Sequence, residues 1–162
     1  MAHERVQDKD REAVAEFIEK LWHSRKVMSC GRAFFPHEEE GFLERRDDEI
    51  IGLVTFRCEE QAMEVLTLNS TLEGAHIGSA LVLTVIDEAR SRKLTHMWLT
   101  TTNDNLKALG FFQRLGFRLV EVHPGVVDDA RKIKPEIPEY GQEGIPIHDE
   151  LVLELRLKPF LD

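Results

Sequence analysis

An apolar run that ends in a glycine turn and continues into a helix is the stretch best suited to chemistry. Residues 65–68 are a strand-like run, Gly74 and Gly78 follow, and helical spacing of apolar residues begins at Ile77. Backbone N–H groups at a helix start have no partner within the helix, and the helix dipole adds positive potential there. The spacing therefore predicts a site for phosphate oxygens.

Two known phosphate-binding motifs do not fit this stretch. It lacks the Gly-Lys-Ser/Thr ending of a P-loop, which argues against a nucleotide triphosphatase. It also lacks the three-glycine spacing of a Rossmann fingerprint, and the strands before it read as a meander and not as the start of a βαβ unit. Two glycines alone more often mark a tight turn that needs positive φ.

Hydrophobic periodicity predicts one α/β domain over residues 1–162. A first helix carries an apolar face from Val14 to Trp22 and can be capped by Asp8 or Asp10, and an irregular segment over 23–37 follows. The later predicted elements are three antiparallel strands over 41–46, 49–58 and 62–68, a buried helix from residue 77, a strand over 97–101, a helix over 106–115, a strand over 117–122, a short helix over 125–132 and a last strand over 151–157.

Composition limits the classes of partner. The net charge of −9 and a pI near 5.3 argue against nucleic acid or an anionic membrane as the main partner. The acidity would suit a cationic acceptor, although solubility explains it better. Cys30 and Cys58 do not have a zinc spacing, and the run 37–40 (His-Glu-Glu-Glu) reads better as a solvated loop than as a metal site. With no signal peptide and no membrane-length run, a soluble cytoplasmic protein is expected.

A second sequence motif, over residues 105–117, indicates which phosphate-containing ligand the glycine turn would bind. It reads Asn105-x-x-Ala108-x-x-Phe111-Phe112-x-x-x-Gly116-Phe117. Together with the glycine turn, it resembles the GNAT superfamily of N-acetyltransferases. That family shows a Gln/Arg-x-x-Gly-x-Gly/Ala loop and then an Asn-x-x-Ala-x-x-Phe-Tyr-x-x-x-Gly-Phe block. The resemblance covers residues 42–122 well and implies a GNAT-like fold, a mixed central sheet of about six to seven strands flanked by helices.

The resemblance implies acetyl-CoA as the cosubstrate and no metal. The pantetheine arm is expected to pair with residues 66–68, with the Leu68 N–H donating to the thioester carbonyl and Asn105 contacting the pantetheine amides. Phe112, at the tyrosine position of the motif, is also expected to contact the coenzyme. The residues expected to bind coenzyme A are Leu66, Leu68, Gly74, Ala75, His76, Ile77, Gly78, Ser79, Asn105 and Phe112.

The implied reaction is direct attack of a primary amine on the thioester, so a base or a water chain must take the amine proton. Glu64 is the candidate base, because strand alternation places it on the same face as Leu66 and Leu68. An exposed strand carboxylate without a catalytic role is the alternative interpretation. Asp104 is a second acidic candidate, although helix capping accounts for it better.

Three residues depart from the family pattern. Phe112 replaces a tyrosine that is thought to protonate the leaving thiolate. His76 replaces the first motif glycine, where a side chain could crowd the phosphates or force an unusual φ, and Glu73 replaces the usual Gln or Arg. Two functions therefore remain open, an acyl-CoA-dependent N-acyltransferase and an acyl-CoA-binding module with little turnover.

The acceptor is expected to be an amine of a small molecule or peptide, and a homodimer is compatible with the family. Phe34 and Phe35 either pack on the core or line a substrate pocket. The run 148–150 (His-Asp-Glu) precedes the last strand and could line an acceptor site or a dimer contact.

Overall fold

The computed structural model describes residues 3–158, which form two compact units. The first comprises residues 3–27, 34–97 and 157–158, and the second comprises residues 28–33 and 98–156. Within the described residues, the strands make a mixed sheet of seven strands, and four α-helices accompany them, so the expected mixed α/β fold is confirmed. One domain over 1–162 stays a prediction, and residues 1–2 and 159–162 lie outside the described residues.

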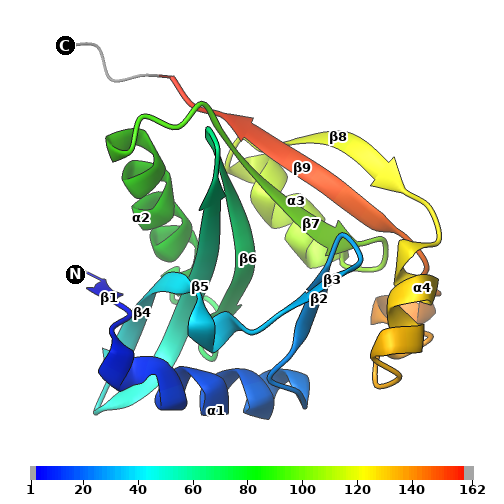
Figure 1. The fold of residues 1–162 in the computed structure, drawn as a ribbon, viewed down its shortest axis with the longest axis horizontal. Helices are drawn as coiled ribbons and strands as arrows, with labels where there is room; N and C mark the ends of the chain where they lie inside the picture. The colour runs from blue at the N-terminus through cyan, green and yellow to red at the C-terminus, as the bar shows by residue number, and fades with distance from the viewer. Residues whose placement is uncertain (1–2, 159–162) are drawn as a thin grey trace. The chain divides into compact units, whose positions relative to one another are not determined.

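The first unit is built on an antiparallel meander. The strands β4 (Glu40–Arg46), β5 (Glu49–Glu59) and β6 (Ala62–Ser70) follow one another, and β1 (Glu4–Arg5) pairs with β4 (Figure 1). Asp47 and Asp48 turn the first hairpin with φ of +52° and +66°, the left-handed values that a tight hairpin requires. The predicted meander is confirmed.

Two helices cover opposite faces of this meander. Leu53 of β5 packs toward α1 (Arg11–Trp22), in a cluster with Ile18. Its neighbour Gly52 faces α2 (Ile77–Ser91), because successive strand residues point to opposite faces. A Cβ on Gly52 would lie 2.5 Å from Ile77 Cγ2, so glycine is required here by the close approach of α2.

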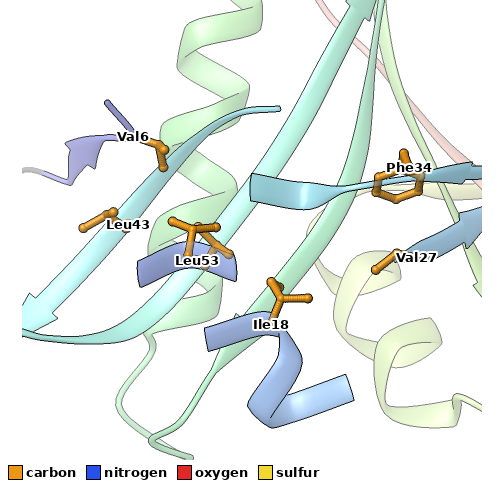
Figure 2. Packing of buried hydrophobic residues seen from close by; sticks show 7 residues of the cluster. Val6, Ile18, Val27, Phe34, Leu43 and Leu53 are labelled. Atoms are coloured by element: carbon orange, nitrogen blue, oxygen red, sulfur yellow. The ribbon is translucent and has the colours of Figure 1, made fainter. Parts of the chain in front are cut away.

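The core on the α1 side joins segments that are distant in sequence. Figure 2 shows Val6, Ile18, Val27, Phe34, Leu43 and Leu53 gathered in one cluster. Phe34 is 5% exposed and belongs to this core, whereas Phe35 is 40% exposed. The predicted first helix extends to Trp22, but Leu21 and Trp22 at its end are exposed, so only the part of its apolar face around Val14 and Ile18 is buried.

The segment predicted to be irregular contains a small hairpin. Its strands are β2 (Val27–Ser29) and β3 (Arg32–Phe34), and they form a separate two-stranded sheet. Cys30 and Gly31 both have positive φ, +52° and +74°, and so form the tight turn between them. The prediction missed this hairpin because its strands are only three residues long.

The second unit contains most of β7 (His96–Thr102), then α3 (Leu106–Arg114), β8 (Arg118–His123), α4 (Val126–Ile133) and β9 (Glu150–Arg156). β8 and β9 pair in antiparallel orientation (Figure 1). Asn105 begins α3 by accepting the Ala108 N–H at 3.1 Å, and Gly116 follows the helix with φ of +101°. The predicted helix start at residue 106 is confirmed, and the helix ends at Arg114, one residue before the predicted end.

Side-chain hydrogen bonds from two residues, Arg131 and Asn103, order the long connection between α4 and β9. Arg131 donates hydrogen bonds to the backbone carbonyls of Ile137, Pro138 and Ile147. Asn103 adds a second set, because its Oδ1 accepts the N–H groups of His148 and Asp149. These bonds order a loop that has little regular structure of its own.

Candidate functional site

The turn between β6 and α2 presents unpaired backbone donors to solvent. Residues 71–76 are all exposed, and the first backbone hydrogen bond of α2 runs from the Ala80 N–H to the His76 carbonyl at 3.1 Å. The N–H groups of Ile77, Gly78 and Ser79 therefore have no acceptor within the helix. These amides stand at the positive end of a 15-residue helix, an arrangement suited to phosphate oxygens.

The conformation of this turn depends on two left-handed residues. Gly74 has φ of +74°, and His76 has φ of +57°, so the expected unusual φ at His76 is confirmed. A left-handed non-glycine residue costs about 1–2 kcal/mol. The His76 carbonyl begins α2, and it also accepts the Ser79 hydroxyl at 3.1 Å.

The Leu68 N–H points away from β5. The Thr71 N–H donates to the Ile51 carbonyl at 2.9 Å, and the register places Leu68 opposite Val54. Hydrogen-bonded and non-hydrogen-bonded pairs alternate along an antiparallel ladder, so the Leu68–Val54 pair is a non-hydrogen-bonded one. The Leu68 amide is therefore directed to the other edge of β6, as a donor to a ligand would have to be.

A β-bulge at Leu66 changes which side chains share a face. Thr55 pairs with Thr67 and Phe56 with Val65, which leaves Leu66 as the extra residue. Glu64 pairs with Arg57 and so lies on the same face as Thr67. The prediction that Glu64 and Leu68 share a face was wrong, because the bulge breaks the period of two between them.

Glu64 is a buried carboxylate on the α1 face. It is only 5% exposed, so the alternative of an exposed strand carboxylate was wrong. Leu66 packs on the same side, against the cluster around Ile18. Across the strand pair, Arg57 binds Glu39, and this hydrogen bond chiefly raises the pKa of the Arg57 guanidinium, with a smaller contribution from the charge of Glu64. A buried carboxylate near a cation fits proton transfer, and it fits a structural ion pair as well.

On the second unit, Asn105 and Asp104 have different roles. Asn105 Oδ1 accepts the Ala108 N–H and also the Gln142 side chain at 3.2 Å, which leaves its amide nitrogen as the remaining polar atom. Asp104 does not cap the helix, contrary to the prediction. It is buried, and it accepts the Thr102 hydroxyl and the Gln142 N–H.

Phe112 lies in an aromatic cluster. Its ring is 6% exposed and meets Phe111 and Phe117 edge-to-face, at centroid distances of 5.0 and 5.4 Å. Packing therefore accounts for an aromatic ring at this position. The ring cannot donate a proton.

The acidic residues of the run 37–40 and the Cys58 thiol make separate contacts and do not gather into one site. Glu39 binds Arg57, Glu40 binds Arg92, and no group of three His, Cys, Asp or Glu side chains within residues 3–158 is arranged to hold a metal ion. Burial raises the pKa of the Cys58 thiol, which lies 3.3 Å from the Arg92 guanidinium. None of the helices between residues 3 and 158 combines the length and apolar character needed to cross a membrane.

The run 148–150 separates into three roles. His148 lies 3.0 Å from Asp128, and Asp149 accepts the Gly125 N–H at 2.8 Å before α4. Glu150 is 4% exposed and accepts the Cys30 N–H. Sequence reasoning grouped these residues by proximity and missed that only Glu150 is a buried charge.

Known proteins resemble this chain over most of its length. The model described as "Acetyltransferase (GNAT) family" matches residues 5–117. The uncharacterized protein YxbD of Bacillus subtilis (strain 168) is 38% identical over 149 residues, which cover 91% of this chain and 94% of that protein.

Two solved structures share the fold. A GNAT family acetyltransferase from Streptococcus pneumoniae has a TM-score of 0.70 at 14% identity, covering 96% of this chain and 99% of the other. A GNAT family acetyltransferase from Elizabethkingia anophelis with acetyl-CoA bound has a TM-score of 0.63 at 23% identity, covering 74% of this chain and 76% of the other.

Proposed function

Since this chain belongs to the acetyltransferase (GNAT) family, we propose that it transfers the acetyl group of acetyl-CoA to a primary amine of a small molecule or peptide. The observation that carries this proposal is the exposed turn over 71–76, which leads into unpaired amides at the start of α2. A structural relative with the same fold has acetyl-CoA bound, which supports the choice of coenzyme.

The pyrophosphate of the coenzyme binds the backbone amides from Gly74 to Gly78, including those of Ala75, His76 and Ile77, with Ser79 at the helix start. Backbone amides and the helix dipole supply this binding, so it does not need a basic side chain at Glu73. The Ser79 hydroxyl is already donated to the His76 carbonyl, so Ser79 offers its backbone N–H.

The thioester lies along the edge of β6 that faces away from β5, with pantetheine beside Leu66 and Leu68. The Leu68 N–H donates to the thioester carbonyl and stabilises the oxyanion of the tetrahedral intermediate. Losing a comparable donor costs about 3–4 kcal/mol in other enzymes. Asn105 and Phe112 are the predicted coenzyme contacts of the second unit.

The reaction forms a C–N bond and breaks a C–S bond. The neutral amine nitrogen attacks the thioester carbon, and Glu64, directly or through water, accepts the proton that the nitrogen loses. The intermediate collapses and expels the coenzyme A thiolate. Because Phe112 has no proton to donate, water protonates this thiolate.

A second candidate function is an acyl-CoA-binding module with little turnover. Phe112 and His76 favour it, since the first lacks the phenol of the family motif and the second replaces a motif glycine. Both functions require the coenzyme site.

Thermal unfolding tests the coenzyme site. Acetyl-CoA and free CoA should raise the melting temperature, and a nucleotide lacking pantetheine should do so less. No shift at millimolar acetyl-CoA would refute both functions. An amine panel with detection of the released thiol then separates them, because only the transferase releases CoA in proportion to amine consumed.

A further inference from the structure

The strand β8 is an edge of the sheet with an exposed apolar surface. β9 pairs with it on one side (Figure 1), and no other strand of residues 3–158 pairs with it. Five of its six residues are exposed, among them Leu119, Val120 and Val122 at 49%, 52% and 57%. Proteins commonly protect such an edge, because its unpaired N–H and C=O groups are a template for another strand.

A β-bulge sorts the side chains of β8 into two faces. Leu119 pairs with Leu153 of β9, and Val122 pairs with Leu151. Val120 lies between them as the extra residue. Because the two β9 residues are two positions apart, Leu119 and Val122 share one face of the sheet, although they are three apart in sequence. The bulge therefore gives β8 an apolar face.

This apolar face continues a buried face of β9. Leu153 is completely buried, and the end of α3 approaches Leu155 on the same face, where a Cβ on Gly116 would lie 3.5 Å from Leu155 Cδ1. Farther out, at the edge of the sheet, Leu119 and Val122 are half exposed. The hydrophobic layer of the second unit thus ends uncovered at β8, and covering it would be favourable.

The charged residues of β8 lie on its opposite face. Arg118, Glu121 and His123 pair with alternate residues of β9, on the other side of that strand. His123 lies 2.5 Å from Glu121. Arg118 has no ion pair within residues 3–158, because its register partner Glu154 binds Arg156. With one arginine and one glutamate the strand is formally neutral, so the net charge of −9 is not concentrated on it.

We propose that β8 is the contact between two copies of this chain, which pair their β8 strands in antiparallel orientation about a twofold axis. The order of side chains carries the inference, because it reads alike from both ends: charged, apolar, bulge, apolar, charged. With full overlap, Leu119 lies opposite Val122 of the second copy, and Arg118 lies diagonal to Glu121 of that copy. The inference does not depend on the proposed transferase function.

The bulge lies at the centre of this register. Regular pairing is therefore possible on each side of it, at 118–119 and at 122–123, and side chains carry much of the interface. By symmetry, the apolar contact and the charged contact each occur twice. A strand of six residues is a small interface, so the dimer is expected to be weak and its population to depend on protein concentration.

Sedimentation velocity of the full chain tests the proposal. The average mass should rise above the 18.7 kDa of one chain as the concentration increases from about 1 to about 500 µM. Val122→Lys should raise the dimer Kd more than roughly tenfold, because it places an ammonium group in both apolar contacts. Leu83→Lys is the matched control, since Leu83 is 54% exposed on α2, and it should leave the Kd unchanged.

Two charge reversals test the contact directly. In dimers of Arg118→Glu alone, carboxylates meet carboxylates, and in dimers of Glu121→Arg alone, guanidinium groups meet guanidinium groups. Each variant by itself should therefore raise the Kd on the order of tenfold. An equimolar mixture of the two variants should dimerise at least as tightly as the wild type, because every such contact then joins opposite charges. Melting temperatures establish that each variant is folded.

Three results would overturn the proposal. The first is a wild-type protein that stays monomeric at about 500 µM, which would leave β8 to a partner of another kind. The second is an equal effect of Val122→Lys and Leu83→Lys. The third is a mixture of the two charge reversals that stays as monomeric as its components. This mixture decides the question even if Val122→Lys fails to fold, since a structural effect within one chain cannot create dimers from two variants that do not dimerise alone.

Discussion

Glu64 and Leu68 lie on opposite faces of β6, because Leu66 forms a bulge between them. The carboxylate lies on the α1 face, whereas the Leu68 N–H points to the strand edge away from β5. The proposed base and the proposed oxyanion donor are therefore supported by different parts of the strand, and each can be altered without the other.

Glu64→Gln should lower kcat by about a hundredfold or more, because general base catalysis typically contributes that much. Stabilisation by acetyl-CoA should stay as in the wild type, since the coenzyme amides are unchanged. The acidic limb of the pH–rate profile should also disappear. Glu59→Gln, an exposed glutamate on β5, is the control, and equal loss of rate in both variants would contradict a catalytic role for Glu64.

Two substitutions at Asn105 separate capping from coenzyme binding. Asn105→Asp keeps the oxygen that accepts the Ala108 N–H but loses the amide donor, so it should preserve stability and weaken acetyl-CoA binding. Asn105→Ala should additionally lower the free energy of unfolding by about 1 kcal/mol. Denaturant unfolding and calorimetric titration measure the two effects. An unchanged acetyl-CoA affinity in Asn105→Asp would show that Asn105 caps α3 but does not bind the coenzyme.

Phe112→Tyr tests whether the missing phenol limits turnover. If the thiolate waits for a proton, the variant should raise kcat, by up to the roughly hundredfold effect of a general acid. Phe111→Tyr, in the same aromatic cluster, serves as the control for adding a hydroxyl there. An unchanged kcat in a stably folded Phe112→Tyr protein would show that water protonates the thiolate fast enough.

Gly52→Ala should loosen the attachment of α2, because the added Cβ would meet Ile77 Cγ2 at 2.5 Å and Leu81 Cδ1 at 3.0 Å. Overpacking of this kind costs about 1–3 kcal/mol. Since Ile77 begins α2, the affinity for acetyl-CoA should fall together with the melting temperature. If Gly52→Ala kept the wild-type affinity for acetyl-CoA and the wild-type melting temperature, α2 would have to shift away from β5 without loss of stability.

Glu88→Gln should lower the free energy of unfolding at neutral pH. It should also make this free energy fall less steeply as the pH is lowered. Burial alone would raise the pKa of Glu88, but hydrogen bonds from Arg5 and Arg92 outweigh it and lower the pKa below the ordinary value. A depressed pKa gives stability that is present above the unfolded value and lost as pH falls through the folded one. Unfolding of both proteins between about pH 6 and pH 3 measures the difference; identical slopes would contradict it.

Local patterns in the sequence were sufficient for most elements and for the family. The meander, the glycine that ends α3 and the unpaired amides at the start of α2 follow from spacing and residue type, because each depends on contacts between near neighbours. The sequence offered Asn103, Asp104 and Asn105 as caps of α3, and the structure selects Asn105. The left-handed φ of His76 was likewise predictable from its place in a glycine motif.

Tertiary contacts decided the rest. The bulge at Leu66 depends on the register between β5 and β6, and periodicity alone cannot show an extra residue in one strand. The burial of Glu64 and Glu150 depends on segments far away in sequence, such as Cys30, which lies 120 residues from Glu150. A carboxylate in a strand looks the same in sequence whether it faces solvent or the core, so only the packed structure identifies these two buried charges.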